Sequence, residues 1–265
     1  MMKKLLALVL ALALCAMSVA ALADTFVMGI DPEYPPFSYL GKDGGYTGFD
    51  VEVCQAVCDS LGWDMEIFAV NWDEKLVQLD SKECDCVWSG MTILDSMKEA
   101  GYVISAPYYD STQVLVVKAD SGFSSSADLA GKIVAVQLGT SGEALLADDL
   151  AELAGTFESI LTCDSFLKCF TELQGNAVDA VFVDLPVAAS YVAKHEGLAI
   201  IDEELGAEQY GIAFRSGDAE LCAQVEEAIQ ALVENGTYAE IASKPEYADI
   251  VNNLLFLNSE EESAA

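Results

Sequence analysis

Short apolar runs alternate along the chain with segments whose apolar residues recur at helical spacing. Residues 178–183 have the length and β-branched content of a buried strand, and residues 49–61 have the periodicity of an amphipathic helix. The pattern predicts further strands at residues 26–30, 65–70, 84–88, 114–118, 133–137 and 210–214. It predicts further helices at residues 72–80, 126–130, 166–173, 187–195, 219–235 and 238–242, and one that begins at Glu143. Such alternation predicts an α/β fold with parallel-rich sheets flanked by helices.

Residues 1–23 have the pattern of a secretory signal peptide. Two lysines precede an apolar run over residues 5–14, and small residues occupy the cleavage positions before Asp24. We therefore expect a secreted or periplasmic, extracytoplasmic protein. Lipid anchoring at Cys15 is the alternative, but Leu14 stands where a lipid-attachment site favours a small residue.

Acidic residues dominate the charge of the chain. It has 44 Asp and Glu against 12 Lys and Arg, which gives a formal net charge of −32 at pH 7. A surface of this sign repels nucleic acid and anionic membranes, so neither is an expected partner. Because the acids are dispersed, we interpret them as the solvated surface of a soluble protein, which we expect to be a monomer.

Seven of the eight cysteines follow the signal segment, and their spacing matches no zinc-ribbon motif. His195 is the only histidine, which is too few to complete a mixed metal site, so we expect no metal and no other cofactor. The favoured interpretation of the cysteines is small buried apolar residues. A disulfide between Cys163 and Cys169 is the alternative for that pair.

An acid, Asp184, follows the apolar run at residues 178–183. In an open α/β sheet, ligands bind beyond the carboxyl ends of the strands, where this carboxylate would meet a cationic group of a small ligand. The alternative is an N-cap for the next helix, because Pro186 falls in the first turn. The local pattern leaves both interpretations open.

Seven segments give the chain a family resemblance through their order and spacing. They are DPEYPPFSY, GGYTGFDVEVCQAV, LVQLDSKECDCVWSGMT, SAPYYDSTQVLVV, DLAGKIVAVQLGTSGEALL, AVDAVFVDLPVAASYV and YGIAFR. The sequence resembles the family-3 extracellular solute-binding proteins, which bind amino acids for ABC importers. The resemblance covers nearly all of the chain after residue 23. It implies a two-lobed periplasmic-binding-protein-like fold of type II, whose lobes close on a ligand.

The resemblance also implies how the chain is divided. Lobe one would comprise residues 24–111 and 210–265, and lobe two residues 112–209. Two hinge strands, near residues 111–116 and 209–213, would join the lobes. The closed protein would deliver a small polar amino acid to the permease subunits of an ABC transporter. A ligand-sensing protein is an alternative that the same fold allows.

The same resemblance assigns ligand-binding roles to residues of this sequence. Asp184 would hold the ligand ammonium group, together with Ser89, the carbonyl of Gly90 and the hydroxyl of Thr92. Tyr34 and Trp72 would sandwich the ligand side chain. Asp31 lies at the end of a predicted strand, where it would contact a basic or polar group of the ligand. Asp50 opens the helix predicted at residues 49–61, and we expect it to cap that helix.

The α-carboxylate of an amino acid needs hydrogen-bond donors. Thr140 and Ser141 precede a predicted helix, whose free N–H groups would supply them. The family adds an Arg clamp, which this sequence lacks. Counting forward from Thr92 puts the clamp position at Met97, whereas counting backward from the SAPYY segment puts it at Lys98. We expect Lys98 to take the role, with less geometric specificity than an Arg. If Met97 holds the position, the helix N-terminus alone holds the α-carboxylate, and an amine without a carboxylate becomes an alternative ligand.

An enzyme is the rival class, because some relatives of this fold are small-acid dehydratases. General acid–base catalysis needs a proton carrier near the substrate. His195 lies at a predicted helix end, and no Ser-His-Asp or Cys-His arrangement can be built without it. Glu143, beside the anion-binding loop, is the one acid that we would test as a general base. We therefore expect binding without catalysis.

Overall fold

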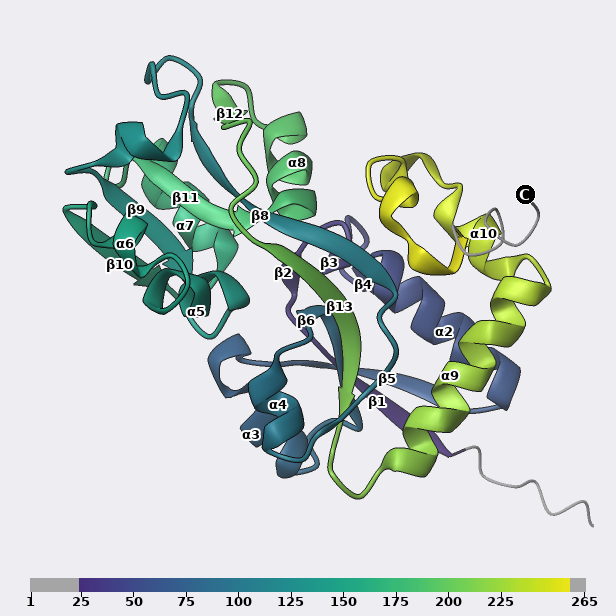
Figure 1. The fold of residues 1–265 in the computed structure, drawn as a ribbon. Helices are drawn as coiled ribbons and strands as arrows, with labels where there is room; N and C mark the ends of the chain where they lie inside the picture. The colour runs from purple at the N-terminus through teal and green to yellow at the C-terminus, as the bar shows by residue number, and fades with distance from the viewer. Residues whose placement is uncertain (1–23, 258–265) are drawn as a thin grey trace, which may run out of the picture.

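The computed structural model describes residues 24–257, and Figure 1 shows two lobes joined by two long strands. The predicted signal peptide and Cys15 lie outside the described residues. The strands are β1 (Thr25–Ile30), β2 (Glu33–Tyr34), β3 (Ser38–Leu40), β4 (Tyr46–Thr47), β5 (Asp64–Ala69), β6 (Cys86–Thr92), β7 (Val103–Ile104), β8 (Tyr109–Lys118), β9 (Ile133–Gln137), β10 (Ser159–Cys163), β11 (Ala180–Asp184), β12 (Leu198–Ile200) and β13 (Ala207–Phe214). The α-helices are α2 (Phe49–Leu61), α3 (Lys75–Asp80), α4 (Asp95–Glu99), α5 (Ser141–Ala147), α6 (Ala151–Ala154), α7 (Phe166–Gln174), α8 (Leu185–Lys194), α9 (Ala219–Glu234) and α10 (Thr237–Ala242). Short 3₁₀ turns are η1 (Trp72–Glu74), η2 (Ser126–Leu129), η3 (Pro245–Tyr247) and η4 (Val251–Asn253).

The main sheet runs through both lobes in the order β10-β9-β11-β8-β13-β6-β1-β5, with β12 beside β8 and β7 beside β13. β1 is parallel to β5 and β6, and β9 is parallel to β10 and β11. We call the group around β1, β5 and β6 the first lobe, and the group around β9, β10 and β11 the second lobe. These parallel groups, with helices packed on them, confirm the predicted α/β class.

β8 and β13 connect the two lobes. They pair with each other antiparallel from Tyr109 opposite Tyr210 to Thr112 opposite Ala207. Beyond that segment β8 pairs with β11 of the second lobe, and β13 pairs with β6 of the first. Figure 1 shows the two strands side by side between the lobes. The lobe boundaries expected at residues 111 and 210 fall within this paired segment and stay a prediction.

Helices pack on both halves of the sheet. α2 contacts α9 and β5 in the first lobe, whereas α7 contacts β9 and α8 contacts β8 in the second. α2 begins after Gly48, whose φ of 130° and closeness to the Phe37 carbonyl leave no room for a Cβ atom. It ends at Gly62 in the left-handed conformation, so the predicted helix at residues 49–61 is confirmed.

The structure differs from the predicted elements where segments are very short. The small sheet β2-β3-β4 was not predicted, because strands of two or three residues have no measurable periodicity. β6 begins at Cys86 rather than at Cys84, and it continues through Gly90 to Thr92. It continues because Tyr210 and Gly211 of β13 pair with its last two residues.

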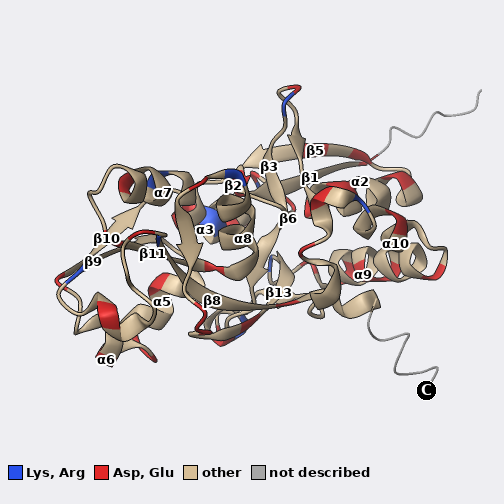
Figure 2. Ribbon diagram, turned by 90° about the horizontal axis from the view of Figure 1, so that it is seen from above, with Lys and Arg blue, Asp and Glu red and all other residues tan. Residues whose placement is uncertain are grey.

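The seven described cysteines are free, buried thiols. Cys163 and Cys169 are therefore not joined by a disulfide, and they pack in the apolar core as small hydrophobic residues. Figure 2 shows acidic positions spread over both lobes, with basic positions few among them. Within residues 24–257, no helix has the length and apolar character needed to cross a bilayer. Nor does this range hold a cluster of three or more potential metal ligands.

Candidate functional site

Asp184 ends β11 and is only 4% exposed. Its carboxylate accepts hydrogen bonds from Tyr34 Oη and Gln113 Nε2. Its backbone occupies the N-cap position of α8, but its side chain makes no capping hydrogen bond. Burial, and then the neighbouring Glu208, raise the pKa of Asp184 well above its ordinary value. The carboxylate is therefore engaged between the lobes and not with the helix that follows it.

A second carboxylate, Glu208 of β13, lies beside Asp184 and was not predicted as a site residue. Gln113 Nε2 donates to Glu208 Oε1 at 3.0 Å while it also donates to Asp184. Glu208 Oε2 accepts from Thr92 Oγ1 at 2.7 Å and from Ser141 Oγ at 2.8 Å. Two buried acidic side chains thus share one amide donor, which leaves the site rich in hydrogen-bond acceptors.

Aromatic rings cover the next part of the pocket. The rings of Tyr34 and Trp72 are stacked with centroids 6.5 Å apart and an interplanar angle of 12°. The hydroxyls of Tyr34 and Tyr210 lie 2.8 Å apart. Phe37 is fully buried against Tyr210 and belongs to the core. The polar edge of the Tyr34 ring therefore faces the carboxylates, and its flat face lies toward Trp72.

Lys75 brings a cation to the pocket that sequence reasoning missed. Its Nζ atom lies 4.8 Å from the centre of the Trp72 ring and donates to the Trp72 carbonyl at 3.1 Å and to the Gly139 carbonyl at 2.6 Å. Burial lowers the pKa of Lys75 to about 8. Three nearby acids oppose that shift: Asp73, Asp31 and Glu143.

Asp31 and Ser89 lie behind the pocket wall. Asp31 Oδ2 accepts a hydrogen bond from Gln137 Nε2 of the second lobe at 2.8 Å, and burial raises the pKa of Asp31. The hydroxyl of Ser89 accepts from the backbone N–H of Asp31 at 3.0 Å and bonds to the hydroxyl of Ser38 at 2.5 Å. Asp31 lines an adjacent pocket with Trp72 and Gln137. Ser89 instead fixes the backbone of Asp31.

Gly90 is held by Asp50, which was expected to cap α2. The N-cap residue is Gly48, and Asp50 Oδ2 accepts instead from the Gly90 N–H and the Tyr108 hydroxyl, each at 2.7 Å. Gly90 has a φ of 53°, and a Cβ atom there would lie 2.2 Å from the Tyr34 ring. The expected cap is thus corrected: the segment folds so that the buried carboxylate fixes β6 against Tyr34. Burial raises the pKa of Asp50 to about 7.

α4 directs Met97, and not Lys98, toward the pocket. Met97 is 3% exposed and lines the pocket next to Met91. The side chain of Lys98 is 55% exposed, and its nearest recorded acid is Asp95 at 3.7 Å. Arg215 binds carbonyls and carboxylates away from this pocket. A helical turn can direct only one of two successive residues inward, and here it directs Met97, so Lys98 does not line the pocket.

The loop before α5 is occupied by the chain's own side chains. The N–H of Gly139 donates to Glu143 Oε2 at 2.8 Å, and the N–H of Glu143 donates to Thr140 Oγ1 at 3.2 Å. The Thr140 hydroxyl in turn donates to the Gln137 carbonyl at 2.7 Å. The Glu143 carboxylate therefore already accepts a hydrogen bond from the loop, and it is not directed into the pocket.

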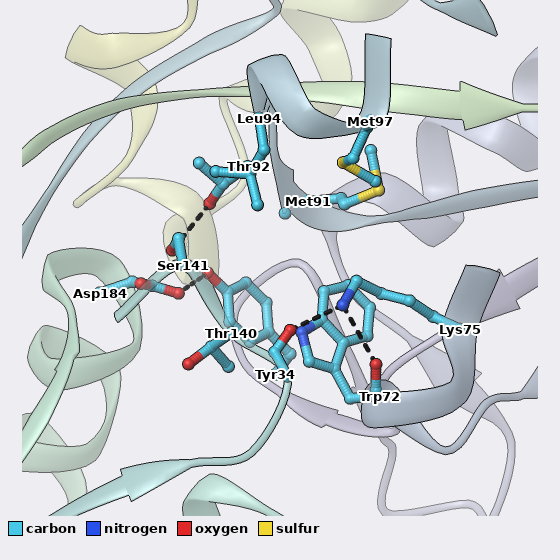
Figure 3. A pocket seen from close by; sticks show the side chains of 12 residues that line it. Tyr34, Trp72, Lys75, Met91, Thr92, Leu94, Met97, Thr140, Ser141 and Asp184 are labelled. Atoms are coloured by element: carbon cyan, nitrogen blue, oxygen red, sulfur yellow. Dashed lines mark hydrogen bonds between the residues drawn. The ribbon is translucent and has the colours of Figure 1, made fainter. Parts of the chain in front are cut away.

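Figure 3 shows these side chains converging from both lobes, with Asp184 and Ser141 on one side of Tyr34 and Lys75 beside Trp72. The cavity volume is about 20 Å³, room for roughly one water molecule, so a ligand must displace side chains to enter. Seven predicted residues line the pocket: Tyr34, Trp72, Gly90, Thr92, Thr140, Ser141 and Asp184. Met97, the alternative clamp position, also lines the pocket, and the four lining residues that were not predicted for the site are Lys75, Met91, Leu94 and Gly139.

Comparison with known proteins identifies the family. Residues 26–244 match the bacterial extracellular solute-binding proteins, family 3. The chain belongs to this family. The L-cystine-binding protein TcyJ of Escherichia coli is 35% identical over 91% of this chain and 94% of its own length. The arginine-binding periplasmic protein of Mannheimia haemolytica is 30% identical over 83% of this chain and 90% of its own.

A solved structure gives the same result for the fold. A substrate-binding protein of an ABC uptake transporter from Streptococcus pneumoniae, with bound histidine, superposes with a TM-score of 0.78. It is 26% identical and covers 82% of this chain and 90% of its own. The predicted two-lobed, periplasmic-binding-protein-like fold is thus confirmed. Two of these relatives are named for different amino acids and the third was solved with bound histidine, so family membership does not specify one ligand.

Proposed function

We propose that the protein binds a small, positively charged solute, an amino acid or an amine, between its lobes outside the cytoplasm. It would then deliver that solute to the permease subunits of an ABC importer. The carboxylate of Asp184 carries this proposal, because it is buried at the strand end that faces both lobes. A buried carboxylate with hydrogen-bond acceptors around it favours an ammonium group, which supplies several donors and one positive charge.

Contacts across the cleft support closure of the lobes around that solute. Gln137 of the second lobe donates to Asp31 of the first, and the hydroxyl oxygens of Ser141 in the second lobe and Thr92 in the first lie 3.1 Å apart. The strands β8 and β13 pass between the lobes side by side, so a bend in both would separate the two halves. We place the hinge at this paired segment.

Binding without catalysis is the favoured activity. His195 Nδ1 lies 2.9 Å from the Tyr191 carbonyl oxygen and its ring stacks on Tyr191, so His195 packs on the last turn of α8 and does not line the pocket. Glu143, the acid that could serve as a general base, accepts the N–H of Gly139. We further propose that residues 1–23 direct export as a cleaved signal peptide, and that the mature protein acts as a monomer.

Calorimetry on the Asp184→Asn variant tests the proposal. The panel comprises the common amino acids and their decarboxylated amines, and the variant keeps the shape of the side chain while removing its charge. Loss of a charge-assisted contact in a desolvated cleft should weaken binding by ~2–5 kcal/mol. Asp120→Asn removes the same charge from an exposed position of the second lobe and should leave binding unchanged. Unchanged affinity in Asp184→Asn would remove Asp184 from the site.

A further inference from the structure

The cleft contains carboxylates where an α-amino acid would place its own. We infer, resting on the proposed function, that the solute is a primary amine with an apolar body and no α-carboxylate. Glu208 and Glu143 accept from the hydroxyls of Thr92 and Ser141 and from the N–H of Gly139, and Met97 takes the inward position of α4 where a cationic clamp would lie. Asp184 and Glu208 together then form a binding site for an ammonium group.

The hydroxyl donors are engaged by Glu208. Its Oε2 atom accepts from Thr92 Oγ1 at 2.7 Å and from Ser141 Oγ at 2.8 Å. Each of these hydroxyls has one proton to donate, so neither can donate to a second carboxylate at the same time. Glu208 is 9% exposed, which places its charge inside the protein, where it would repel a ligand carboxylate strongly.

One backbone donor of the loop, the N–H of Gly139, is engaged by Glu143. The N–H of Gly139 donates to the Glu143 carboxylate at 2.8 Å, and Thr140 caps the N–H of Glu143. A ligand carboxylate at the N–H of Gly139 would have to displace the carboxylate of Glu143. Of the two elements that the sequence assigns to an α-carboxylate, the loop therefore already carries a side-chain carboxylate, and the inward position of α4 carries the uncharged Met97.

The cation of the pocket, Lys75, does not compensate for the missing Arg. Its Nζ atom already donates to the carbonyls of Trp72 and Gly139. Its charge is also balanced by three acids: Asp73, Asp31 and Glu143. In Figure 3 Lys75 lies beside Trp72, whereas Asp184 and Ser141 lie beyond Tyr34. An α-carboxylate is bonded to the same carbon as the ammonium, so it would lie near Asp184 and Glu208 and not near Lys75.

The pair of carboxylates fits an ammonium group. Gln113 Nε2 donates to both Asp184 and Glu208, so one nitrogen atom can reach oxygens of both residues. An ammonium has three N–H donors and a positive charge, which an uncharged amide lacks, and it would relieve the repulsion between the two acids. The remaining wall contains the ring of Trp72 and three aliphatic or thioether side chains, which suit an apolar body: Met91, Leu94 and Met97.

Matched pairs of ligands test the inference. Binding of the full mature chain is measured by calorimetry for phenylalanine and phenethylamine, tyrosine and tyramine, lysine and cadaverine, and arginine and agmatine. The amine of at least one pair should bind tighter than its amino acid by about tenfold or more. The Glu208→Gln variant keeps an acceptor for the two hydroxyls and removes the charge. In that variant the amine should bind about tenfold weaker than to the parent protein. The ratio between the affinities for the amine and for the matching amino acid should therefore decrease.

Each result separates the inference from the proposed function. Tighter binding of the amino acids in every pair would overturn the inference and leave the proposed function intact. No binding of any compound would overturn both. If Glu208→Gln lowers the affinity for amine and amino acid equally, Glu208 only supports the fold, and its role in selection is overturned. The melting temperature of Glu208→Gln, compared with that of Gln209→Ala on the exposed face of the same strand, identifies a folding defect.

Discussion

The ammonium group of Lys75 donates a hydrogen bond across the cleft to the carbonyl oxygen of Gly139 at 2.6 Å. Lys75 begins α3 of the first lobe, and Gly139 follows β9 of the second. The contact joins two segments that are distant in the sequence, and it lies beside Trp72 at the pocket. We therefore expect the Lys75 side chain to stabilise the closed arrangement of the two lobes.

Replacing Lys75 with Met should therefore open the ligand-free protein. Met keeps an apolar stem against Trp72 and removes the donor, at a cost to the closed form of about 1 kcal/mol. Small-angle scattering without ligand should show a larger radius of gyration for Lys75→Met. Lys42→Met, an exposed change of the same charge in the first lobe, should leave the radius unchanged. Equal radii for Lys75→Met and the parent would show that the contact does not hold the lobes together.

A second prediction concerns Gly139, where the backbones of the two lobes meet. Its φ is 74°, and a Cβ atom there would lie 2.7 Å from the Cα atom of Asp73 in the first lobe. Gly139→Ala should therefore hinder closure and weaken the binding of the tightest compound of the panel. Scattering with that compound at saturation should show less compaction than in the parent protein.

Gly131→Ala is the matched control for Gly139→Ala. Gly131 has a φ of 70°, but a Cβ atom there would meet nothing within 4 Å. Both variants carry the backbone strain of a left-handed alanine, about 1 kcal/mol of stability. Only Gly139→Ala adds a contact between the lobes. Similar ligand affinities in the two variants would mean that the lobes do not approach each other at Gly139 when ligand binds.

The sequence predicted the elements that carry periodicity and missed the contacts between distant segments. Asp184 could be found because an acid ends a fully apolar strand, and α2 because its spacing and Gly62 define it. Glu208 and Tyr210 are two residues apart in β13 and lie on the same face of the strand. Because Tyr210 faces the interior, the strand periodicity of two predicts that Glu208 is buried as well. That signal was missed because the predicted strand began only at residue 210.

Lys75 and Met97 show where sequence reasoning fails. Lys75 is one of several lysines in a polar sequence, and only the approach of the second lobe places a carbonyl at its Nζ atom. The choice between Met97 and Lys98 depended on a loop length that differed by one residue between two ways of counting. α4 has five residues, too few for an amphipathic pattern to decide which side chain faces inward.

The last prediction concerns Asp50, a buried acid that holds β6 through the Gly90 N–H and the Tyr108 hydroxyl. Burial raises its pKa in the folded protein from 3.8 to about 7. Between these two values the folded state binds a proton that the unfolded state has lost, so stability falls as the pH rises. The stabilisation is complete below pH 3.8 and is lost as the pH rises through about 7.

The Asp50→Asn variant removes this titration and keeps the size of the side chain. Urea unfolding of both proteins from pH 4.5 to 7.5 should show the parent losing stability relative to the variant at roughly 1.4 kcal/mol per pH unit below about pH 7. Asp31 and Asp184 also have raised pKa values, but they are present in both proteins and cancel in the difference. Parallel pH profiles would mean that Asp50 is ionised throughout this range. In that case Gly90 would be held by a buried charge, and its hydrogen bond would be insensitive to mild acid.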